Sequence, residues 1–200
     1  MSDLDKKSTD PGGIDAPRIE AAVREILLAI GENPDREGLL KTPRRVAAAC
    51  AELFVGLRDD PRRHLRVTFD EDHREMVVLR DIPFSSTCEH HLLPFTGRAH
   101  VGYIPNGRIV GLSKLARMIE GYARRPQVQE RLTSEIANAI MEELQPSGCG
   151  VMIEAVHTCM TIRGVEKPGS TMVTSAMRGG FRNRPETRAE FLAIVRHGAS

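Results

Sequence analysis

Excess charge and long apolar runs are both missing from this sequence of 200 residues, which carries a formal net charge of +1. A general nucleic-acid binder normally has a marked basic excess, so we expect no nucleic-acid partner. No stretch approaches the roughly 18 uninterrupted apolar residues of a membrane span, so we expect no membrane partner either. The N-terminus also lacks the apolar core of a secretory signal. These absences predict a cytoplasmic protein, with enough residues for one full hydrophobic core.

Cysteine is scarce as well, with four residues in the whole chain. Without an export signal, reduced thiols are a better expectation than disulfides. Cys50 falls on the apolar stripe of a predicted helix, and Cys149 lies between two glycines at the start of a predicted strand. Both are expected to be core residues, which leaves Cys88 and Cys159 as the pair to explain.

The first 60 residues predict a tail followed by two helices. Residues 1–16 have little to bury, which is typical of a disordered segment. Apolar residues at helical spacing between Ile19 and Ile30 predict a helix that ends at Gly31. Thr42 and Pro43 predict the cap and first position of a second helix. We therefore divide the chain into a disordered tail (1–16), an N-terminal helical region (17–60) and a main domain (61–200).

The main domain is expected to be α+β. Period-two patterns predict strands near 76–84 and 97–104, a third from 148 through 163, and a fourth over 171–177. A helix capped by Ser113 ends before Pro126, and two more are expected over 127–144 and 188–196. The resulting order is β-β-α-α-β-β and a final helix, with no internal repeat.

Cys88, His91 and Cys159 are candidate metal ligands. Two thiols and one imidazole form a set that binds zinc, and three protein ligands leave a fourth position open for water, as in catalytic zinc sites. The Cys88-x-x-His91 spacing places two of them on one turn, although this motif alone is weak. His90 and His157 lie beside the two halves of the set and could move protons near that water. A purely structural role for His90 is the alternative.

Strand alternation suggests how the second half of the site is built. In a regular strand, His157, Cys159, Thr161 and Arg163 would project from one face and offer an imidazole, a thiol, a hydroxyl and a guanidinium together. The alternative is the polar face of a half-buried strand, but histidine and cysteine are uncommon on a solvent face.

A basic group near the third helix predicts an anion site. Ser113 and Lys114 open this helix, where free backbone N–H groups and the helix dipole favour negative charge. Arg117 shares the face of Lys114, and Arg163 would add a cation from the strand. A solvated basic helix face is the alternative. Glu130 falls in the first turn of the following helix, where a carboxylate is stabilised in any case.

Several long motifs together resemble the GTP cyclohydrolase I family. The resemblance covers about residues 17–197, with the motifs in the family's order and spacing. The motifs are STCEHHLLPF (86–95), GYIP (102–105), GLSKL (111–115), RPQVQERLT (125–133), HTCM (157–160), RGV (163–165) and TS (174–175).

The resemblance implies a zinc enzyme that converts GTP and water to 7,8-dihydroneopterin triphosphate and formate, the first step of tetrahydrofolate biosynthesis. The implied zinc ligands are Cys88, His91 and Cys159, and the implied proton-transfer residues are His90 and His157. The implied substrate-binding residues are Glu130 on the guanine edge, Gln129 also at the substrate, Ser113, Lys114, Arg117 and Arg163 around the triphosphate, and Lys41 from a neighbouring subunit.

The family's architecture is the tunnelling fold, which implies a four-stranded antiparallel sheet with a helix pair between strands two and three. It also implies a homodecamer with active sites between subunits. Two other functions stay open at this point. One is another tunnelling-fold enzyme acting on a pterin or deazapurine, and the other is a non-catalytic, zinc-stabilised GTP-binding protein.

Overall fold

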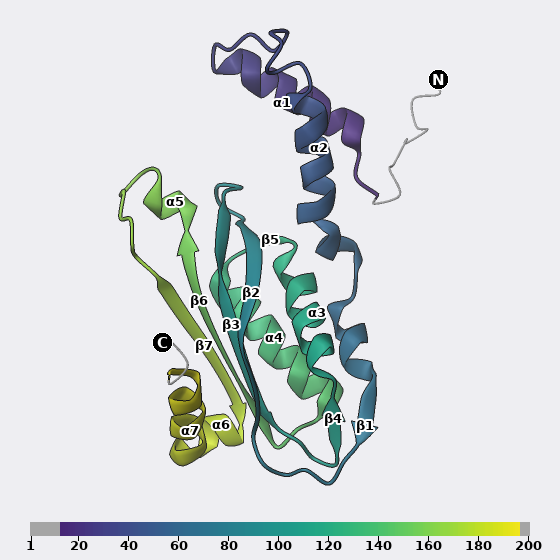
Figure 1. The fold of residues 1–200 in the computed structure, drawn as a ribbon, viewed down its shortest axis with the longest axis vertical. Helices are drawn as coiled ribbons and strands as arrows, with labels where there is room; N and C mark the ends of the chain where they lie inside the picture. The colour runs from purple at the N-terminus through teal and green to yellow at the C-terminus, as the bar shows by residue number, and fades with distance from the viewer. Residues whose placement is uncertain (1–12, 197–200) are drawn as a thin grey trace, which may run out of the picture. The chain divides into compact units, whose positions relative to one another are not determined.

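The computed structural model describes residues 13–196, and the tail predicted over residues 1–16 lies largely outside this range. The chain divides into two compact units, Met1–Val55 and Gly56–Ser200. Within the described residues, no helix is long and apolar enough to cross a membrane. The elements, drawn in Figure 1, are α1 (Ala16–Ala29), α2 (Thr42–Leu53), η1 (Val55–Arg58), η2 (Pro61–Arg66), β1 (Thr68–Asp70), β2 (Val77–Cys88), β3 (Pro94–Ile104), β4 (Arg108–Val110), α3 (Leu112–Ala123), β5 (Pro126–Gln127), α4 (Gln129–Leu144), β6 (Gly148–His157), α5 (Thr158–Thr161), β7 (Met172–Gly179), α6 (Gly180–Asn183) and α7 (Pro185–Arg196).

The N-terminal unit holds the two predicted helices. The Asp15 carboxylate accepts from the backbone N–H group of Arg18 and caps α1, whose C-cap residue is Ile30. The second helix begins one residue away from its prediction. Lys41, not Thr42, occupies the N-cap position of α2, and no side chain caps the helix there. The shift follows from the backbone of Lys41, which is already close to helical (φ −100°, ψ 0°).

A five-stranded sheet forms the main unit, in the order β5-β2-β3-β6-β7. The four long strands are antiparallel, as predicted. The prediction of a four-stranded sheet was short by one strand, because the two-residue β5 pairs in parallel with the end of β2 at Thr87 and Cys88. A run of two residues is too short for period-two alternation to reveal. A separate two-stranded sheet pairs β1 with β4.

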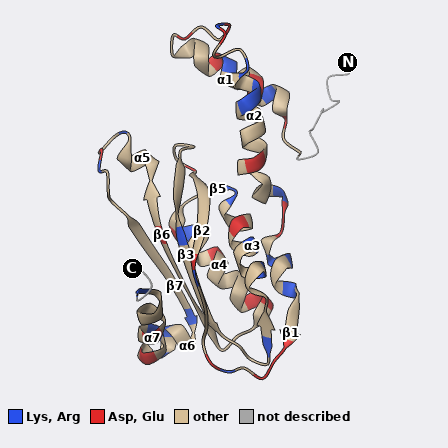
Figure 2. Ribbon diagram, viewed as in Figure 1, with Lys and Arg blue, Asp and Glu red and all other residues tan. Residues whose placement is uncertain are grey.

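Helices cover both faces of the five-stranded sheet. On one face, α3 and α4 pack Leu115 and Ile136 against Val101 of β3 in the larger core cluster. On the other face, Phe181 of α6 and Phe191 of α7 form a smaller cluster over one end of the sheet. Figure 2 shows basic and acidic residues interleaved on the helices, with neither sign dominant.

Glycine permits the close packing of this smaller cluster. A Cβ atom on Gly102 would lie 2.8 Å from a ring carbon of Phe191, and one on Gly150 would lie 2.6 Å from a ring carbon of Phe181. The rings therefore occupy space that any other residue at these positions would fill. The α+β architecture of the tunnelling fold is thus present, with the helix pair α3 and α4 between β3 and β6.

Two local predictions near the expected site were wrong. The third strand does not continue through Arg163, because β6 ends at His157 and the chain turns into the short helix α5. Ser113 does not cap α3. Gly111 is the N-cap residue, with an extended backbone, and Leu112 begins the helix.

Candidate metal centre and active site

A tight turn at the end of β2 presents Cys88 and His91. The carbonyl oxygen of Cys88 accepts from the N–H groups of His91 (3.4 Å) and Leu92 (2.9 Å). The N–H group of Cys88 donates to the carbonyl oxygen of Leu93 (2.8 Å). Leu92 has a φ of +53°, a conformation that is uncommon for a residue with a side chain. This turn brings the Sγ atom of Cys88 to 3.7 Å from Nδ1 of His91.

Cys159 approaches these two residues from α5. The pairing of Phe95 with His157 aligns the end of β6 with the start of β3. The Thr158 hydroxyl then donates to the Pro94 carbonyl oxygen at 2.6 Å and holds the first residue of α5 against β3. The ligand atoms of Cys88, His91 and Cys159 all lie within 4.8 Å of one another. The sequence predicted this meeting, although a helical turn brings it about where a strand was expected.

The chemistry of this donor set fits a zinc ion. Tetrahedral zinc with bonds of roughly 2.3 Å to sulfur and 2.0 Å to nitrogen places those two atoms about 3.5 Å apart. Cys88 and His91 are close to this spacing already, at 3.7 Å. No fourth histidine, cysteine or carboxylate joins the group within residues 13–196. Three ligands would leave one position open. Cys88 is buried, Cys159 is partly buried and His91 is exposed.

Two neighbouring thiols need a cation to become thiolates together. Burial raises the pKa of the Cys159 thiol, and the neighbouring Cys88 raises it further, while the charge of Arg163 lowers it. Arg163 alone therefore does not offset the first two effects. A divalent ion between the two sulfur atoms would supply the missing positive charge.

His157 is held on two sides next to this cluster. Its ring stacks on Phe95 with centroids 4.5 Å apart and planes 6° from parallel. Its Nε2 atom lies 2.8 Å from Oε1 of Gln129. Burial lowers the pKa of His157, and the nearby carboxylate of Glu130 opposes this shift. The structure thus places His157, Gln129 and the first turn of α4 beside the cysteine cluster.

Gln129 is a buried residue, with 1% of its surface exposed. Its Nε2 group lies within hydrogen-bond distance of the carbonyl oxygens of Ile153 and Met172 (3.0 Å each) and of the Thr174 hydroxyl (3.1 Å). The predicted contact of Gln129 with substrate therefore competes with four contacts inside the protein. Sequence reasoning missed this anchoring role.

His90 faces outward from the same turn. Its ring is 80° from the plane of the His91 ring, and its side chain is 65% exposed. The neighbouring Glu89 forms a two-pronged ion pair with Arg131 of α4, with N···O distances of 2.5 and 3.1 Å. The pair connects the turn that carries Cys88 to α4, the helix that begins at Gln129. Sequence reasoning missed it too, because residues 42 positions apart show no shared periodicity.

The model of the GTP cyclohydrolase I family matches residues 19–196. The chain belongs to the GTP cyclohydrolase I family. Curated members called GTP cyclohydrolase 1 include one from Thermobifida fusca, 63% identical over 187 residues that cover 92% of this chain and 90% of the relative. Another, from Rhodopirellula baltica, is 57% identical over 97% of this chain and 85% of its own length. A third, from Carboxydothermus hydrogenoformans, is 60% identical over 92% and 96%.

Among solved structures, the apo form of the archaeosine synthase QueF-Like aligns with a TM-score of 0.44 and 19% identity. The alignment covers 52% of this chain and 94% of that chain.

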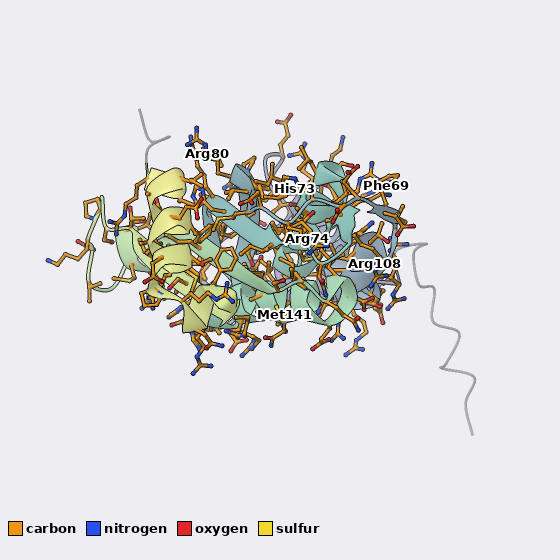
Figure 3. All side chains as sticks on the ribbon, turned by 90° about the horizontal axis from the view of Figure 1, so that it is seen from below. Phe69, His73, Arg74, Arg80, Arg108 and Met141 are labelled. Atoms are coloured by element: carbon orange, nitrogen blue, oxygen red, sulfur yellow. The ribbon has the colours of Figure 1, made fainter. Side chains whose placement is uncertain are left out.

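The basic residues that the family resemblance assigns to the triphosphate are not gathered around the metal cluster of one chain. Helix α3 begins at Leu112, just after β4, in which the Val110 N–H group donates to the Tyr103 hydroxyl (3.2 Å). The helix ends at Ala123, whose carbonyl oxygen accepts from the Ser86 hydroxyl (2.7 Å). The rise of an α-helix places Lys114 roughly 14 Å below Ala123. Figure 3 looks onto this far end of the sheet, where Phe69 and Arg108 are exposed.

The other predicted phosphate contacts are placed as follows. Ser113 and Arg117 share the far end of α3 with Lys114, and the charges of Arg117 and Lys114 help to lower the pKa of His64, after burial and Arg63. Arg163 follows α5 and acts on Cys159. Lys41 belongs to the N-terminal unit, at the N-cap of α2. Within one chain, Arg163 is thus the one cation of the main unit's predicted set that lies near the cluster.

Proposed function

We propose that this protein is a zinc-dependent GTP cyclohydrolase that converts GTP and water to 7,8-dihydroneopterin triphosphate and formate. The observation that carries the proposal is the meeting of Cys88, His91 and Cys159, with ligand atoms within 4.8 Å, in a chain of this family. The reaction would begin tetrahydrofolate biosynthesis, in the cytoplasm.

Zinc is the cofactor that suits this donor set. When bound, the ion would supply Lewis acidity and lower the pKa of a bound water. The two thiolates would neutralise its formal charge, so that the effect is smaller than at an all-histidine site. The exposure of His91 would leave this cluster accessible to a substrate.

His157 and His90 would move protons during hydrolysis. His157 is held by Phe95 and Gln129 beside the cluster, so its ring is preorganised. It would exchange protons with water and with the ring nitrogens of guanine while the bond at C8 is hydrolysed. His90, on the exposed side of the turn, would serve the second proton-transfer position. Formate then leaves, and the ribose carbons rearrange and close the pterin ring.

Glu130 would select guanine. Its carboxylate is exposed in the first turn of α4, close enough to His157 to affect that residue's pKa. A carboxylate accepts from both the N1–H and N2–H donors of guanine, and adenine lacks this pair of donors. A site left with an unpaired carboxylate rejects the wrong base strongly.

The triphosphate would be held partly by a second copy of the chain. Lys114 and Arg117 lie along α3 away from the cluster of their own chain, whereas Arg163 lies beside it. A neighbouring subunit that brings its α3 to this cluster would complete the phosphate site. Ser113 would add its hydroxyl there, and Lys41 would come from a neighbour in the same way. We therefore propose a homo-oligomer with active sites between subunits, and the resemblance to the family favours a decamer.

Incubation of the zinc-loaded protein with GTP tests the function directly. We expect one formate per GTP consumed and the appearance of pterin fluorescence after oxidation. The Cys159→Ser variant should bind less zinc and release no formate, while the buried Cys149→Ser variant serves as a thiol control away from the cluster. Formate release by a verified metal-free preparation, or equal turnover of ATP and GTP, would contradict the proposal. Absence of any product would favour the non-catalytic GTP-binding alternative.

A further inference from the structure

Gln129 is bonded in a way that decides the orientation of its own amide. Its nitrogen faces two backbone carbonyl oxygens, those of Ile153 and Met172, each at 3.0 Å. Carbonyl oxygens only accept hydrogen bonds, so the group facing them must be the NH2 group. A flipped amide would place oxygen against oxygen twice in a buried site. The atom facing His157 is therefore the amide oxygen.

A closed ring of hydrogen bonds holds this orientation. The Thr133 hydroxyl donates to the carbonyl oxygen of Gln129 at 2.6 Å. It also lies 2.6 Å from the Thr174 hydroxyl, which itself lies 3.1 Å from the Gln129 amide nitrogen. Thr133 donates its hydrogen to the carbonyl oxygen, so Thr174 donates to Thr133. The Thr174 oxygen then shares the two amide hydrogens with the carbonyl oxygens of Ile153 and Met172, because the amide has two hydrogens for three acceptors. Three elements, α4, β6 and β7, thus share the task of fixing one side chain.

The fixed amide oxygen dictates which nitrogen of His157 carries hydrogen. An oxygen 2.8 Å from Nε2 accepts, so Nε2 must be the protonated nitrogen in the neutral ring. The other nitrogen, Nδ1, then keeps its lone pair. Parallel stacking on Phe95 prevents the ring from swivelling about this bond.

We propose that Gln129 is the positioning residue for His157, and that it holds the ring by Nε2–H so that Nδ1 is the atom that exchanges protons with the substrate. This inference rests on the proposed function for the identity of the substrate. It replaces the predicted direct contact of Gln129 with GTP, because the amide has no hydrogen left to offer.

A split between kcat and KM distinguishes positioning from substrate binding. The Gln129→Met variant keeps the side-chain length and removes the amide. We expect kcat to fall about 100-fold, as for a misplaced proton-transfer group, with KM for GTP within about twofold of the parent. Zinc content should not change. The matched control is Thr133→Ser, which changes the same buried site but keeps the hydroxyl of the ring, and kcat should stay within about threefold of the parent. A raised KM with unchanged kcat in Gln129→Met would overturn the proposal.

A measurement on the unmodified enzyme keeps the proposal testable even if Gln129→Met does not fold. Solid-state NMR of the zinc-loaded protein labelled with ¹⁵N-histidine distinguishes protonated from bare ring nitrogens. The His157→Gln variant identifies the resonances that belong to His157. A protonated Nε2 with a bare Nδ1 supports the proposal, and the opposite tautomer overturns it. Because this spectrum needs no turnover, it decides the role of Gln129 even if the protein releases no formate from GTP.

Discussion

Mixing two impaired variants would reveal whether one active site needs two chains. Cys159→Ser damages the metal cluster and leaves α3 intact, whereas Lys114→Ala damages the basic end of α3 and leaves the cluster intact. Lys114 lies roughly 14 Å along the helix from the end that reaches the cluster region. If each site takes its cluster from one chain and Lys114 from a neighbour, a hybrid oligomer contains some sites with both halves intact.

The activity expected of the hybrid oligomers follows from the fraction of their active sites that are intact. In an equal, random mixture, the chance that a cluster is intact is one half, and the chance that the neighbouring Lys114 is intact is also one half. About one quarter of the sites should therefore be fully intact, as for any heterologous interface populated at random. Each lost phosphate contact is worth about 1.5–3 kcal/mol, so Lys114→Ala alone should lower kcat/KM roughly 10- to 100-fold.

The assay is formate release by co-expressed, differently tagged variants purified through both tags in turn. Native mass spectrometry of the purified sample verifies that the oligomers are hybrids. Cys159→Ser mixed with Cys88→Ser is the matched control, because both lesions lie in the same half and no site regains a full cluster. Hybrids of Cys159→Ser and Lys114→Ala no more active than the mean of the two pure variants would refute a shared site. Recovery in the Cys88→Ser control would refute the counting argument.

Three further predictions concern single contacts. Reversal of charge at Glu89 or at Arg131 alone should lower Tm, because the two side chains face each other in a two-pronged ion pair. The double reversal should recover most of the lost Tm. A double variant with a Tm as low as that of the single variants would contradict the pairing. Burial lowers the pKa of His100, and the neutral ring accepts from the N–H group of Asp81 at 3.2 Å. The folded state thus binds fewer protons than the unfolded chain, so this contribution to stability is present above about pH 6.5 and is lost as pH falls through the folded pKa. Urea midpoints of the parent and His100→Gln, at fixed protein concentration, should therefore converge as the pH falls from 8 to 5, and parallel curves would contradict the assignment. Glu130→Gln should lower kcat/KM for GTP about 100-fold by weakening two hydrogen bonds to a charged acceptor, and an unchanged ratio of GTP to ATP turnover would remove Glu130 from base recognition.

Much of the fold was accessible from local patterns. Period-two alternation located the four long strands, and apolar spacing located α3 and α4 to within two residues at each end. These signals are strong because each element buries one face in the same core. The predicted strand through Arg163 failed for a physical reason. Thr158 bonds to Pro94 across the sheet, and Ile162 donates to Thr158 within the turn at 3.1 Å, so tertiary and local hydrogen bonds outweigh an alternation of residue types.

The candidate metal ligands and the family could be predicted from the sequence alone, because Cys88, His91 and Cys159 carry a distinctive chemistry and lie in long, specific motifs. Their meeting within 4.8 Å was decided by pairing of β3 with β6, which no local pattern encodes. The role of Gln129 was likewise decided by folding, since its four partners come from β6 and β7. Residue chemistry is local and can be read along the chain. The orientation of a buried amide depends on acceptors up to 45 residues away, and only the folded chain brings them together.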